Sequence, residues 1–323
     1  MPKKTRRLSS KKEGPTTKEK VKVVDELRPK YSLKILLKVS GLSKSTYFYY
    51  HSEKHIQAEK RRKEDDERIY QIILPVFEHH KSRYGSRRIK LAIPELADIN
   101  HKKVERIMRE HSLFGKQPKH KYHSYKGDNG ENKENLLLHK EVIDNKTTYI
   151  RDFNTTKPNE KWTTDVSEFK APGGKLYLSP ILDMYDGSII AYDISICPDF
   201  TQTKRMIDKA FKDNPNLEGL IFHSDQGWQY QMKPYQQWLK DKGILQSFSR
   251  KGNCMDNSLM ENFFGIMKNE MYYGYEYKSI EELRKTMEEY ITYYNTERIN
   301  SKRKGLSPLA YRQQSFSQLQ LNY

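Results

Sequence analysis

The chain has 323 residues, and its 59 lysines and arginines outnumber its 42 aspartates and glutamates, which gives a formal net charge of +17. This length predicts about two domains. No apolar run approaches the ~18 residues of a membrane span, and no apolar segment follows the basic start, which excludes a secretory signal. Two cysteines are too few for a disulfide framework or a cysteine-rich zinc module. A reducing cytoplasm is therefore the expected setting.

Basic residues are concentrated in the first half of the chain. Residues 1–150 carry 36 basic and 20 acidic side chains, whereas residues 151–323 carry 23 and 22. A basic half joined to a neutral half indicates a unit that binds a polyanion, with nucleic acid as the first candidate. The alternative is a basic tail that only keeps the protein soluble.

The first elements predict a small helical module. Residues 1–30 are rich in lysine and lack an apolar period, which predicts a basic disordered tail. Residues 32–50 then predict two short helices about a turn: Gly41 ends the first, and Ser43 caps the second, which carries Lys44. This pattern is typical of a helix-turn-helix, with Lys44 as a candidate DNA contact. Small helical hairpins without a DNA role show the same pattern.

Further helices are expected over the rest of a helical DNA-binding region that spans residues 31–114. Residues 55–80 predict a long helix, and residues 84–113 predict a second helical pair, with Ser86 and Asn100 as candidate caps. Basic side chains on this pair suit contact with DNA phosphates, although any one of them also fits an ordinary exposed helix face. They are Arg87, Arg88, Lys102, Lys103 and Arg106.

A change in composition marks the next boundary. A segment rich in glycine and asparagine predicts a linker over residues 115–158. Beyond it the pattern becomes strand-like, and residues 159–275 predict a compact domain. A carboxyl-terminal helix and tail over residues 276–323 are expected to complete it.

The order of elements in this domain predicts a mixed α/β sheet, with antiparallel strands first and helical crossovers after them. A strand is expected over 161–169, followed by a hairpin of strands 175–184 and 188–196. The elements expected after them are a helix over 201–212 capped by Thr201, a strand over 220–223, a helix over 232–242, a strand over 246–249, and helices that begin at Ser258 and Ser279.

Three acids occupy positions where strand ends and helix starts around one sheet can converge. Asp165 lies within the first expected strand, Asp225 directly after the fourth, and Glu261 in the first turn of the helix from Ser258. Each acid also has a structural interpretation. Asp165 would fit a charge on an edge strand, Asp225 would fit turn chemistry, and Ser258-x-x-Glu261 fits a capping box.

Phosphoryl transfer with two divalent ions is the chemistry that uses three carboxylates together. Carboxylate oxygens are hard ligands suited to Mg²⁺ or Mn²⁺. Two ions about 3.5–4 Å apart can stabilise the attacking and leaving oxygens of an in-line displacement. No side-chain nucleophile is then required, and the sequence has no P-loop motif that would bind ATP.

The acids and their surroundings resemble the three motifs of D,D-35-E transposases, and 35 residues separate Asp225 from Glu261. The motifs are Trp162-Thr163-Thr164-Asp165, His223-Ser224-Asp225-Gln226-Gly227, and Asp256-Asn257-Ser258 with Glu261-Asn262-Phe263-Phe264. Segments downstream that look like the family's are Lys268-Asn269-Glu270 and Tyr294-Asn295…Arg298…Leu306-Ser307-Pro308…Tyr311. Segments upstream that look like its helix-turn-helix modules are 42–47, 84–89 and 100–108. From about residue 30 to 312 the chain resembles transposases of the insertion-sequence-three group, whose core is similar to retroviral integrases.

The resemblance implies both a fold and an activity. The fold is a ribonuclease-H-like α/β core with a mixed sheet, preceded by all-α helix-turn-helix modules. The activity is metal-dependent cutting of DNA at insertion-sequence ends and joining of the freed 3′-hydroxyl. Asp165, Asp225 and Glu261 would be the catalytic residues and the ligands of two Mg²⁺ or Mn²⁺ ions. Asn257 and Lys268 would contact the DNA end.

The implied partners are double-stranded DNA, both the terminal inverted repeats of the element and its target, and further copies of the chain. The chain resembles the second-reading-frame product of such elements, which implies a first-reading-frame partner or fusion. A cytoplasmic, nucleoid-associated bacterial protein with no membrane contact is expected.

Three other functions fit parts of the pattern. A nuclease with the same fold and metals would only hydrolyse nucleic acid. A non-catalytic DNA-binding regulator, or a partner of the fused transposase, would not need the three acids. A tyrosine recombinase fits less well, because no cluster of arginine and histidine surrounds one tyrosine in the sequence.

Overall fold

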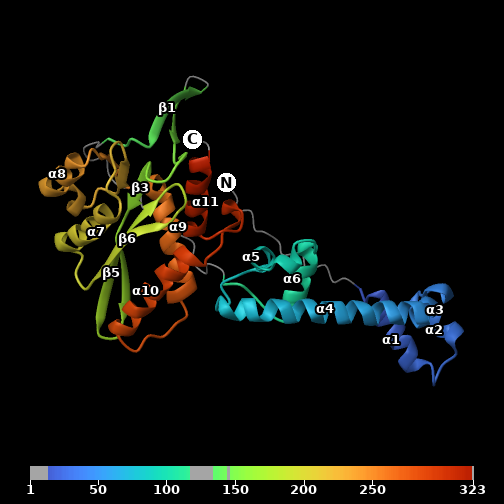
Figure 1. Cartoon of the computed structure of the whole chain (residues 1–323). Coiled ribbons are helices and arrows are strands. Elements are labelled where there is room, and N and C mark those ends of the chain that lie inside the picture. Colours follow the sequence, from blue (N-terminus) through green and yellow to red (C-terminus); the bar gives the residue numbers. More distant parts are fainter. Residues whose placement is uncertain (1–13, 117–133, 144–145, 322–323) are drawn as a thin grey trace. The chain divides into compact units, whose positions relative to one another are not determined.

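The computed structural model describes residues 14–116, 134–143 and 146–321 of the chain (Figure 1). The chain forms two compact units, Met1–Leu74 and Pro75–Tyr323, which we call the amino-terminal and carboxyl-terminal units. Their boundary falls at Pro75, inside helix α4 (Glu53–His79). Proline lacks the N–H of the i→i−4 hydrogen bond, so it weakens a helix at an interior position. The long helix predicted over 55–80 is confirmed.

The amino-terminal unit begins with a helix that was not expected. Helix α1 (Thr17–Leu27) starts with a capping box, in which Thr16 Oγ1 accepts a hydrogen bond from the Glu19 N–H and Glu19 accepts one from the Thr16 N–H. Val21 and Val24 are buried on one face of this helix. The prediction of disorder over 1–30 is therefore wrong for α1, because two spaced valines bury against neighbouring helices despite the surrounding lysines. Residues 1–13 lie outside the described part of the chain.

The helix-turn-helix pattern of the next segment is confirmed at the level of structure. Helix α2 (Leu33–Ser40) ends at Gly41, whose φ of 67° is left-handed, and α3 (Lys44–His51) starts with Ser43 Oγ accepting a hydrogen bond from the Thr46 N–H (3.0 Å). Glycine adopts positive φ without the steric cost that a Cβ would bring. The core of this module consists of Val21, Val24, Leu36, Leu42 and Tyr47.

After the end of α4, the carboxyl-terminal unit continues with the second predicted helical pair. It contains α5 (Ser86–Ala92), the 3₁₀ turn η1 (Pro94–Leu96) and α6 (His101–Glu110). Asn100 caps α6 as predicted, since its Oδ1 accepts a hydrogen bond from the Lys102 N–H (2.9 Å). The predicted cap at Ser86 is wrong, because Gly85 occupies the cap position and the Ser86 hydroxyl is bonded to His101 Nε2 (3.0 Å).

Two strands interrupt the segment predicted to be a linker. Strand β1 (Leu138–Ile143) pairs antiparallel with β2 (Lys146–Arg151), so the linker prediction is wrong over these residues. The base of the hairpin is tied to the rest of the unit, since Arg151 Nε donates to Asp256 Oδ1 (2.7 Å). The glycine- and asparagine-rich run that motivated the linker spans 126–135, of which 126–133 lie outside the described residues.

The main sheet is mixed, as predicted, and has the order β4-β5-β3-β7-β8, with β6 paired to β5. Its strands are β3 (Lys161–Thr164), β4 (Ser167–Ala171), β5 (Gly174–Asp183), β6 (Ile189–Ser195), β7 (Ile221–Ser224) and β8 (Leu245–Phe248). The hairpin predicted over 175–196 is confirmed as β5 and β6. Strands β3, β7 and β8 are parallel to one another, which requires crossover connections.

The single strand predicted over 161–169 is divided into β3 and β4 at Asp165-Val166. Both pieces pair with β5 in one continuous register, because Thr164 lies opposite Ile181 and Ser167 opposite Leu178. This register places Asp165 opposite Pro180, whose carbonyl accepts a hydrogen bond from Thr164 Oγ1 (2.9 Å). Proline has no N–H to give to the ladder, so the strand pairing is lost at Asp165.

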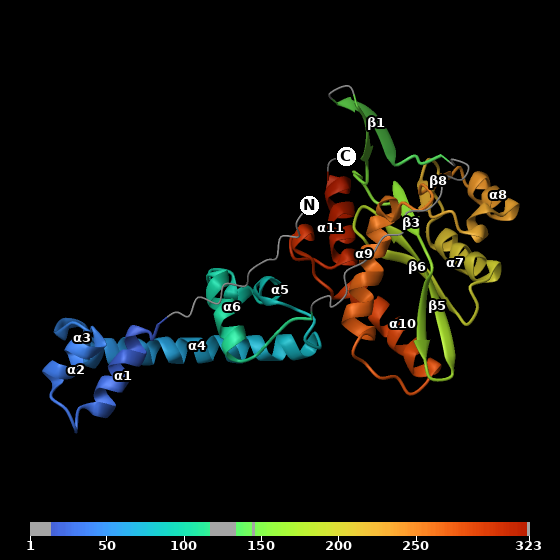
Figure 2. The same cartoon turned by 180° about the vertical axis from the view of Figure 1, so that it is seen from behind.

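Helices cover both faces of the sheet (Figures 1 and 2). Helices α7 (Phe200–Asp213) and α8 (Lys233–Asp241) lie on one face, and α9 (Ser258–Met267) and α10 (Ile280–Thr296) on the other. Each face has its own apolar core, built on Trp162 and Phe222 on the first side and on Phe263 and Met287 on the second.

The ends of the helices around the sheet are set by nearby residues. Helix α10 begins directly after Ser279, close to the predicted start, and Ser279 caps it, while Gly243 follows α8 with a φ of 68°. Helix α7 is capped by Asp199 rather than Thr201, since Asp199 Oδ1 accepts from the Gln202 N–H (2.8 Å). The last helix is α11 (Pro308–Leu321). None of the helices in the described residues combines the length and apolar character that a membrane span requires.

Candidate active site

Strand register brings the first two acids together. In the parallel pair β3·β7, Lys161 lies beside Ile221, Trp162 beside Phe222 and Thr163 beside His223. The same offset of 60 residues places Asp165 beside Asp225, each directly after the end of its strand. The carboxyl ends of neighbouring parallel strands are a common location for functional groups.

The third acid is brought to the same place by Asn257. Its Oδ1 accepts a hydrogen bond from Thr163 Oγ1, and its Nδ2 donates to the Thr164 carbonyl (3.2 Å). Both bonds are buried, and Asn257 immediately precedes α9. Glu261 follows Asn257 by four residues, about one helical turn, so α9 presents Glu261 close to the end of β3.

The pKa of Asp165 reflects its proximity to the other two acids. Burial, the charge of Asp225 and, more weakly, the charge of Glu261 raise the pKa of Asp165 to about 7, against the opposing effects of the Val166 N–H and the Lys268 charge. The pKa of Asp225 is also raised, by burial, and is held down in part by a hydrogen bond from the Gly227 N–H. Like charges at short range disfavour ionisation. The three acids therefore form one electrostatic group, whose negative charge Lys268 compensates only in part.

Of the alternative structural roles considered for the three acids, one is supported and two are not. Strand β3 lies between β5 and β7, so Asp165 is not an edge-strand charge. No capping box forms around Ser258 within this described segment, because the cap position belongs to Asn257 and Ser258 is helical. Asp225 does make a turn, since its Oδ1 accepts from the Gly227 N–H (2.9 Å), and this bond leaves its second oxygen for another role.

The acids are less tightly gathered than a single-ion site would require. Within the described residues, three potential ligand atoms that all lie within 4.8 Å of one another occur only at His79, His80 and Glu297. Outer ligands of a two-ion site bind different ions about 3.5–4 Å apart, so their oxygens spread more widely. Within this group His79 Nε2 contacts Glu297 (2.8 Å), and His80 Nδ1 contacts Tyr293 Oη outside it (3.0 Å).

The two residues predicted to contact the DNA end differ in their surroundings. Lys268 begins the π-helical turn η4 (Lys268–Tyr272) and lies near Asp165, which raises the lysine pKa against the larger lowering by burial. A contact between Lys268 and a DNA phosphate stays a prediction, and the position of Lys268 near Asp165 is consistent with it. Asn257 uses both side-chain polar atoms inside the protein, so the structure favours a positioning role over the predicted DNA contact.

Only some of the cations predicted on the helical pair are exposed for contact with DNA. Arg87 and Lys102 are exposed, whereas Arg106 is bonded to Glu110 (2.9 Å and 3.0 Å). Lys103 is half-buried. Arg88 points toward the protein, with Nη1 3.4 Å from Glu270 Oε1. DNA contact by these residues stays a prediction.

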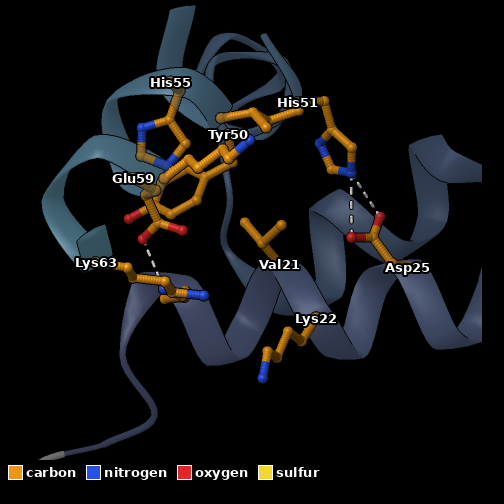
Figure 3. A pocket seen from close by; sticks show the side chains of 11 residues that line it. Val21, Lys22, Asp25, Tyr50, His51, His55, Glu59 and Lys63 are labelled. Carbon is orange, nitrogen blue, oxygen red and sulfur yellow. Dashed lines mark hydrogen bonds and ion pairs between the residues drawn. The ribbon is translucent and has the colours of Figure 1, made fainter. Parts of the chain in front are cut away.

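The amino-terminal unit has a basic hollow of its own, of about 330 Å³ (Figure 3). Its two acids are both paired: His51 Nε2 lies 3.1 Å from Asp25, and Lys18 Nζ lies 2.6 Å from Glu59. The remaining lysines that line it are Lys22, Lys60 and Lys63. The predicted contact residue Lys44 is exposed on α3, away from this hollow. A hollow with excess positive charge favours a polyanion partner.

Several important side chains were not singled out from the sequence. Asp256 is buried and binds Arg250 and Arg151, which fixes the segment before α9. His223 is buried between Ser247 and Ser249 of the neighbouring strand segment (both 2.9 Å), and burial lowers its pKa to about 4. Both lie within the resemblance motifs, which was the available signal. Since Asp256 directly precedes Asn257 and His223 lies two residues before Asp225, these hydrogen bonds fix the backbone beside both site residues.

Replacing Asn257 by alanine is expected to lower strand-transfer activity at least about tenfold, because the end of β3 is no longer tied to the start of α9 and 1.4 kcal/mol of barrier corresponds to a factor of ten. The dissociation constant for element-end DNA should change less than about twofold. Single-turnover joining and fluorescence anisotropy measure the two quantities. A large loss of DNA affinity with a normal joining rate at saturation would instead support the predicted DNA contact.

Comparison with protein families finds matches along most of the chain. Two models described as "Integrase core domain" match residues 155–254 and 261–316, and one described as "HTH-like domain" matches residues 64–121. Among solved structures, the chain is similar to the HTLV-2 integrase catalytic core at 17% identity and a TM-score of 0.37, over 48% of this chain and 97% of that one.

Curated relatives extend over nearly the whole chain. The "Putative transposase InsK for insertion sequence element IS150" of Escherichia coli K12 is 43% identical over 92% of this chain and 99% of its own length. A transposase-like protein of Haemophilus influenzae is 53% identical over 69% of this chain and 97% of its own. The "Probable transposase for insertion sequence element IS1353" of Shigella flexneri is 33% identical over 92% of this chain and 55% of its own. The chain therefore belongs to the insertion-sequence transposases with an integrase-type catalytic core, the family that its three acidic motifs predicted.

Proposed function

We propose that the chain cuts one strand at each end of an insertion sequence and joins the freed 3′-hydroxyl to a second phosphodiester. The observation that carries this proposal is the convergence of Asp165, Asp225 and Glu261 from two strand ends and one helix start. The exchange of one phosphodiester for another needs no nucleotide cofactor. In this reading the three acids are the catalytic residues.

The donor set fits two hard divalent cations, Mg²⁺ or Mn²⁺. The negative charges of Asp225 and Glu261 raise the pKa of Asp165, and the positive charge of Lys268 lowers it. Asp165, Asp225 and Glu261 would hold the ions, which supply charge stabilisation for the attacking and leaving oxygens. The chain's own part is positional: Asn257 keeps α9 against β3, and Lys268 attracts a phosphate of the DNA end.

The proposed partners are double-stranded DNA and further copies of the chain. The HTH-like segment and the basic hollow of the amino-terminal unit supply positive surface for element ends and target. Assembly of several copies on DNA, participation of a first-reading-frame product, and action at the bacterial nucleoid are parts of the same proposal.

Removal of divalent metal is expected to abolish both cutting and joining. The experiment incubates the purified chain with a labelled duplex taken from the DNA that flanks its coding region, with and without EDTA. Joined products should form only with Mg²⁺ or Mn²⁺ and should return when the metal is restored. Metal should also raise the melting temperature of the DNA-free protein, since a ligand that binds only the folded state stabilises it.

The outcomes separate the rival functions. Cut products without joined products would favour a nuclease. Binding without either product would favour a regulator or a partner that needs the fused form. Joined products in EDTA would contradict the proposal.

A further inference from the structure

A second basic hollow, of about 390 Å³, opens among the helices of the carboxyl-terminal unit. Its lining includes Arg83, Arg87, Arg88 and Lys116 against the single acid Glu105. Glu105 is already paired, with its Oε1 3.5 Å from Nη2 of Arg109 on the next turn. The hollow therefore has a strong excess of positive charge, which suits a phosphate group.

One of the lining residues, Arg88, contacts a buried carboxylate, Glu270 of the turn η4. Arg298 donates to it from Nε and Nη2 (2.8 Å and 2.7 Å), and Tyr290 donates from its hydroxyl (2.9 Å). Arg88 makes the longest of these contacts, at 3.4 Å, and 30% of its side chain is exposed toward solvent. Arg88 is thus the partner of Glu270 that is free to share its guanidinium with a ligand in the hollow.

Two further cations of the hollow reach the same turn. Arg83 Nε donates to the Glu270 carbonyl (3.3 Å). Lys116 Nζ donates to the Tyr275 hydroxyl, which in turn donates to the Glu270 carbonyl (3.2 Å). The turn held in this way begins with Lys268, the cation beside Asp165. π-Helical turns are rare and often occur at functional sites.

The crowding of cations is costly in the free protein. Burial lowers the pKa of Lys116, and the charge of Arg83 lowers it further. Arg83 itself is buried and stacked over the Tyr293 ring at 4.4 Å, so it cannot move out to solvent. An anion in the hollow would relieve this repulsion, which is why a ligand is expected there.

We propose that this hollow binds one phosphate of the element-end DNA through Arg87, Arg88 and Lys116, and that the Arg88–Glu270 ion pair links this contact to the turn that carries Lys268. The inference rests on the proposed function, since it names a DNA contact of the transposase and its effect on the catalytic pocket. Phosphate binding draws Arg88 toward the DNA and weakens its contact with Glu270, so that the position of Lys268 on η4 responds to binding of the DNA end.

The binding arm of the test uses the full chain, labelled end DNA and EDTA, so that catalysis is not involved. Arg87→Gln should weaken binding about tenfold and lower the slope of log K against log salt by about one, as expected for one lost phosphate contact. Lys240→Gln, a matched loss of one charge at an exposed position of α8, should change neither quantity. Wild-type affinity and slope for Arg87→Gln and for Arg88→Gln would overturn the pocket.

The coupling arm measures single-turnover joining at saturating DNA and Mg²⁺. Arg87→Gln should recover the wild-type rate, because saturation restores occupancy. Arg88→Gln should remain at least about tenfold slow, and Arg88→Lys should recover only partly, because lysine cannot bridge two anions in the way that guanidinium does. Full recovery of Arg88→Gln at saturation would overturn the link to Glu270.

The two proposals fail in distinguishable ways. If the wild-type chain joins no DNA under any metal condition, the proposed function fails, while the binding arm still decides whether the hollow holds a phosphate. If the wild type joins DNA and Arg87 and Arg88 variants bind normally, only the present inference fails.

Discussion

Replacing Asp165 by asparagine is expected to reduce strand transfer by about a thousandfold or more, which is ~4 kcal/mol of barrier, while end-DNA binding is retained. Asparagine keeps the shape of the side chain but removes one of the three negative charges that would hold the ions. Joined products from labelled ends measure the first effect, and anisotropy measures the second. Asp208→Asn on α7, which removes an exposed carboxylate bonded to Lys204 (2.6 Å), should leave both unchanged.

The same substitution should make the metal-free protein more stable. The pKa of Asp165 is about 7 in the folded state, against 3.8 as its ordinary value, because of burial and the charges of Asp225 and Glu261. Between these values the folded state holds a proton that the unfolded state has lost, so the wild-type stability falls as pH rises from about 4 to 7. The Asp165→Asn variant lacks this loss, and its advantage should grow through that window and then level off.

Thermal unfolding in EDTA at several pH values checks this second effect. Addition of Mg²⁺ should raise the melting temperature of the wild type more than that of the variant. Joining by Asp165→Asn at the wild-type rate would contradict the catalytic assignment. Equal stability of the two proteins from pH 4 to 7 would contradict the electrostatic account.

Removing Arg298 is expected to destabilise the carboxyl-terminal unit by about 3–5 kcal/mol, the usual cost of leaving one partner of a buried ion pair uncompensated. Glu270 is buried and is bonded bidentately by Arg298. Burial alone would raise the pKa of Glu270, but the hydrogen bonds and charge of Arg298, with a smaller effect of Arg88, lower it on balance. Urea unfolding of Arg298→Ala measures the loss.

An exposed ion pair provides the control for this second prediction. Lys204→Ala breaks the exposed contact with Asp208 and should cost no more than ~1 kcal/mol. The double variant Arg298→Met with Glu270→Leu should recover part of the stability, since an apolar replacement of a buried pair is often neutral. Its joining activity should stay low, because η4 has lost its link to Arg88. An Arg298→Ala protein as stable as the wild type would contradict the importance of this pair.

Many local features of this protein follow from neighbouring residues, and these were predictable. Gly41 ends α2, and Ser43, Asn100 and Ser279 cap helices because short polar side chains bond to nearby backbone N–H groups. The mixed sheet followed from the order of strand and helix patterns. The three acids could be singled out because their motifs and the 35-residue spacing are properties of the linear chain.

Other features depended on partners distant in the chain. The valines of α1 gave too weak a pattern among lysines to predict a helix, and burial of these valines in a three-helix core stabilises it. Strand pairing divides at Asp165 because Pro180 lies opposite, which depends on the register of β5. Asn257 had the position of a DNA contact, yet both its polar atoms bind β3, 93 and 94 residues away.

The sequence by itself determined the family, several helix boundaries and the identity of the acids, because these depend on residue type and short spacing. Only the tertiary structure decided which charged side chains are exposed to a ligand and which are paired inside the protein. Arg88 lies in a basic helical segment and would fit a surface cation, but it contacts Glu270, 182 residues away. Chain folding brings such groups together through burial of apolar faces elsewhere, and no local sequence pattern around Arg88 or Glu270 predicts their contact.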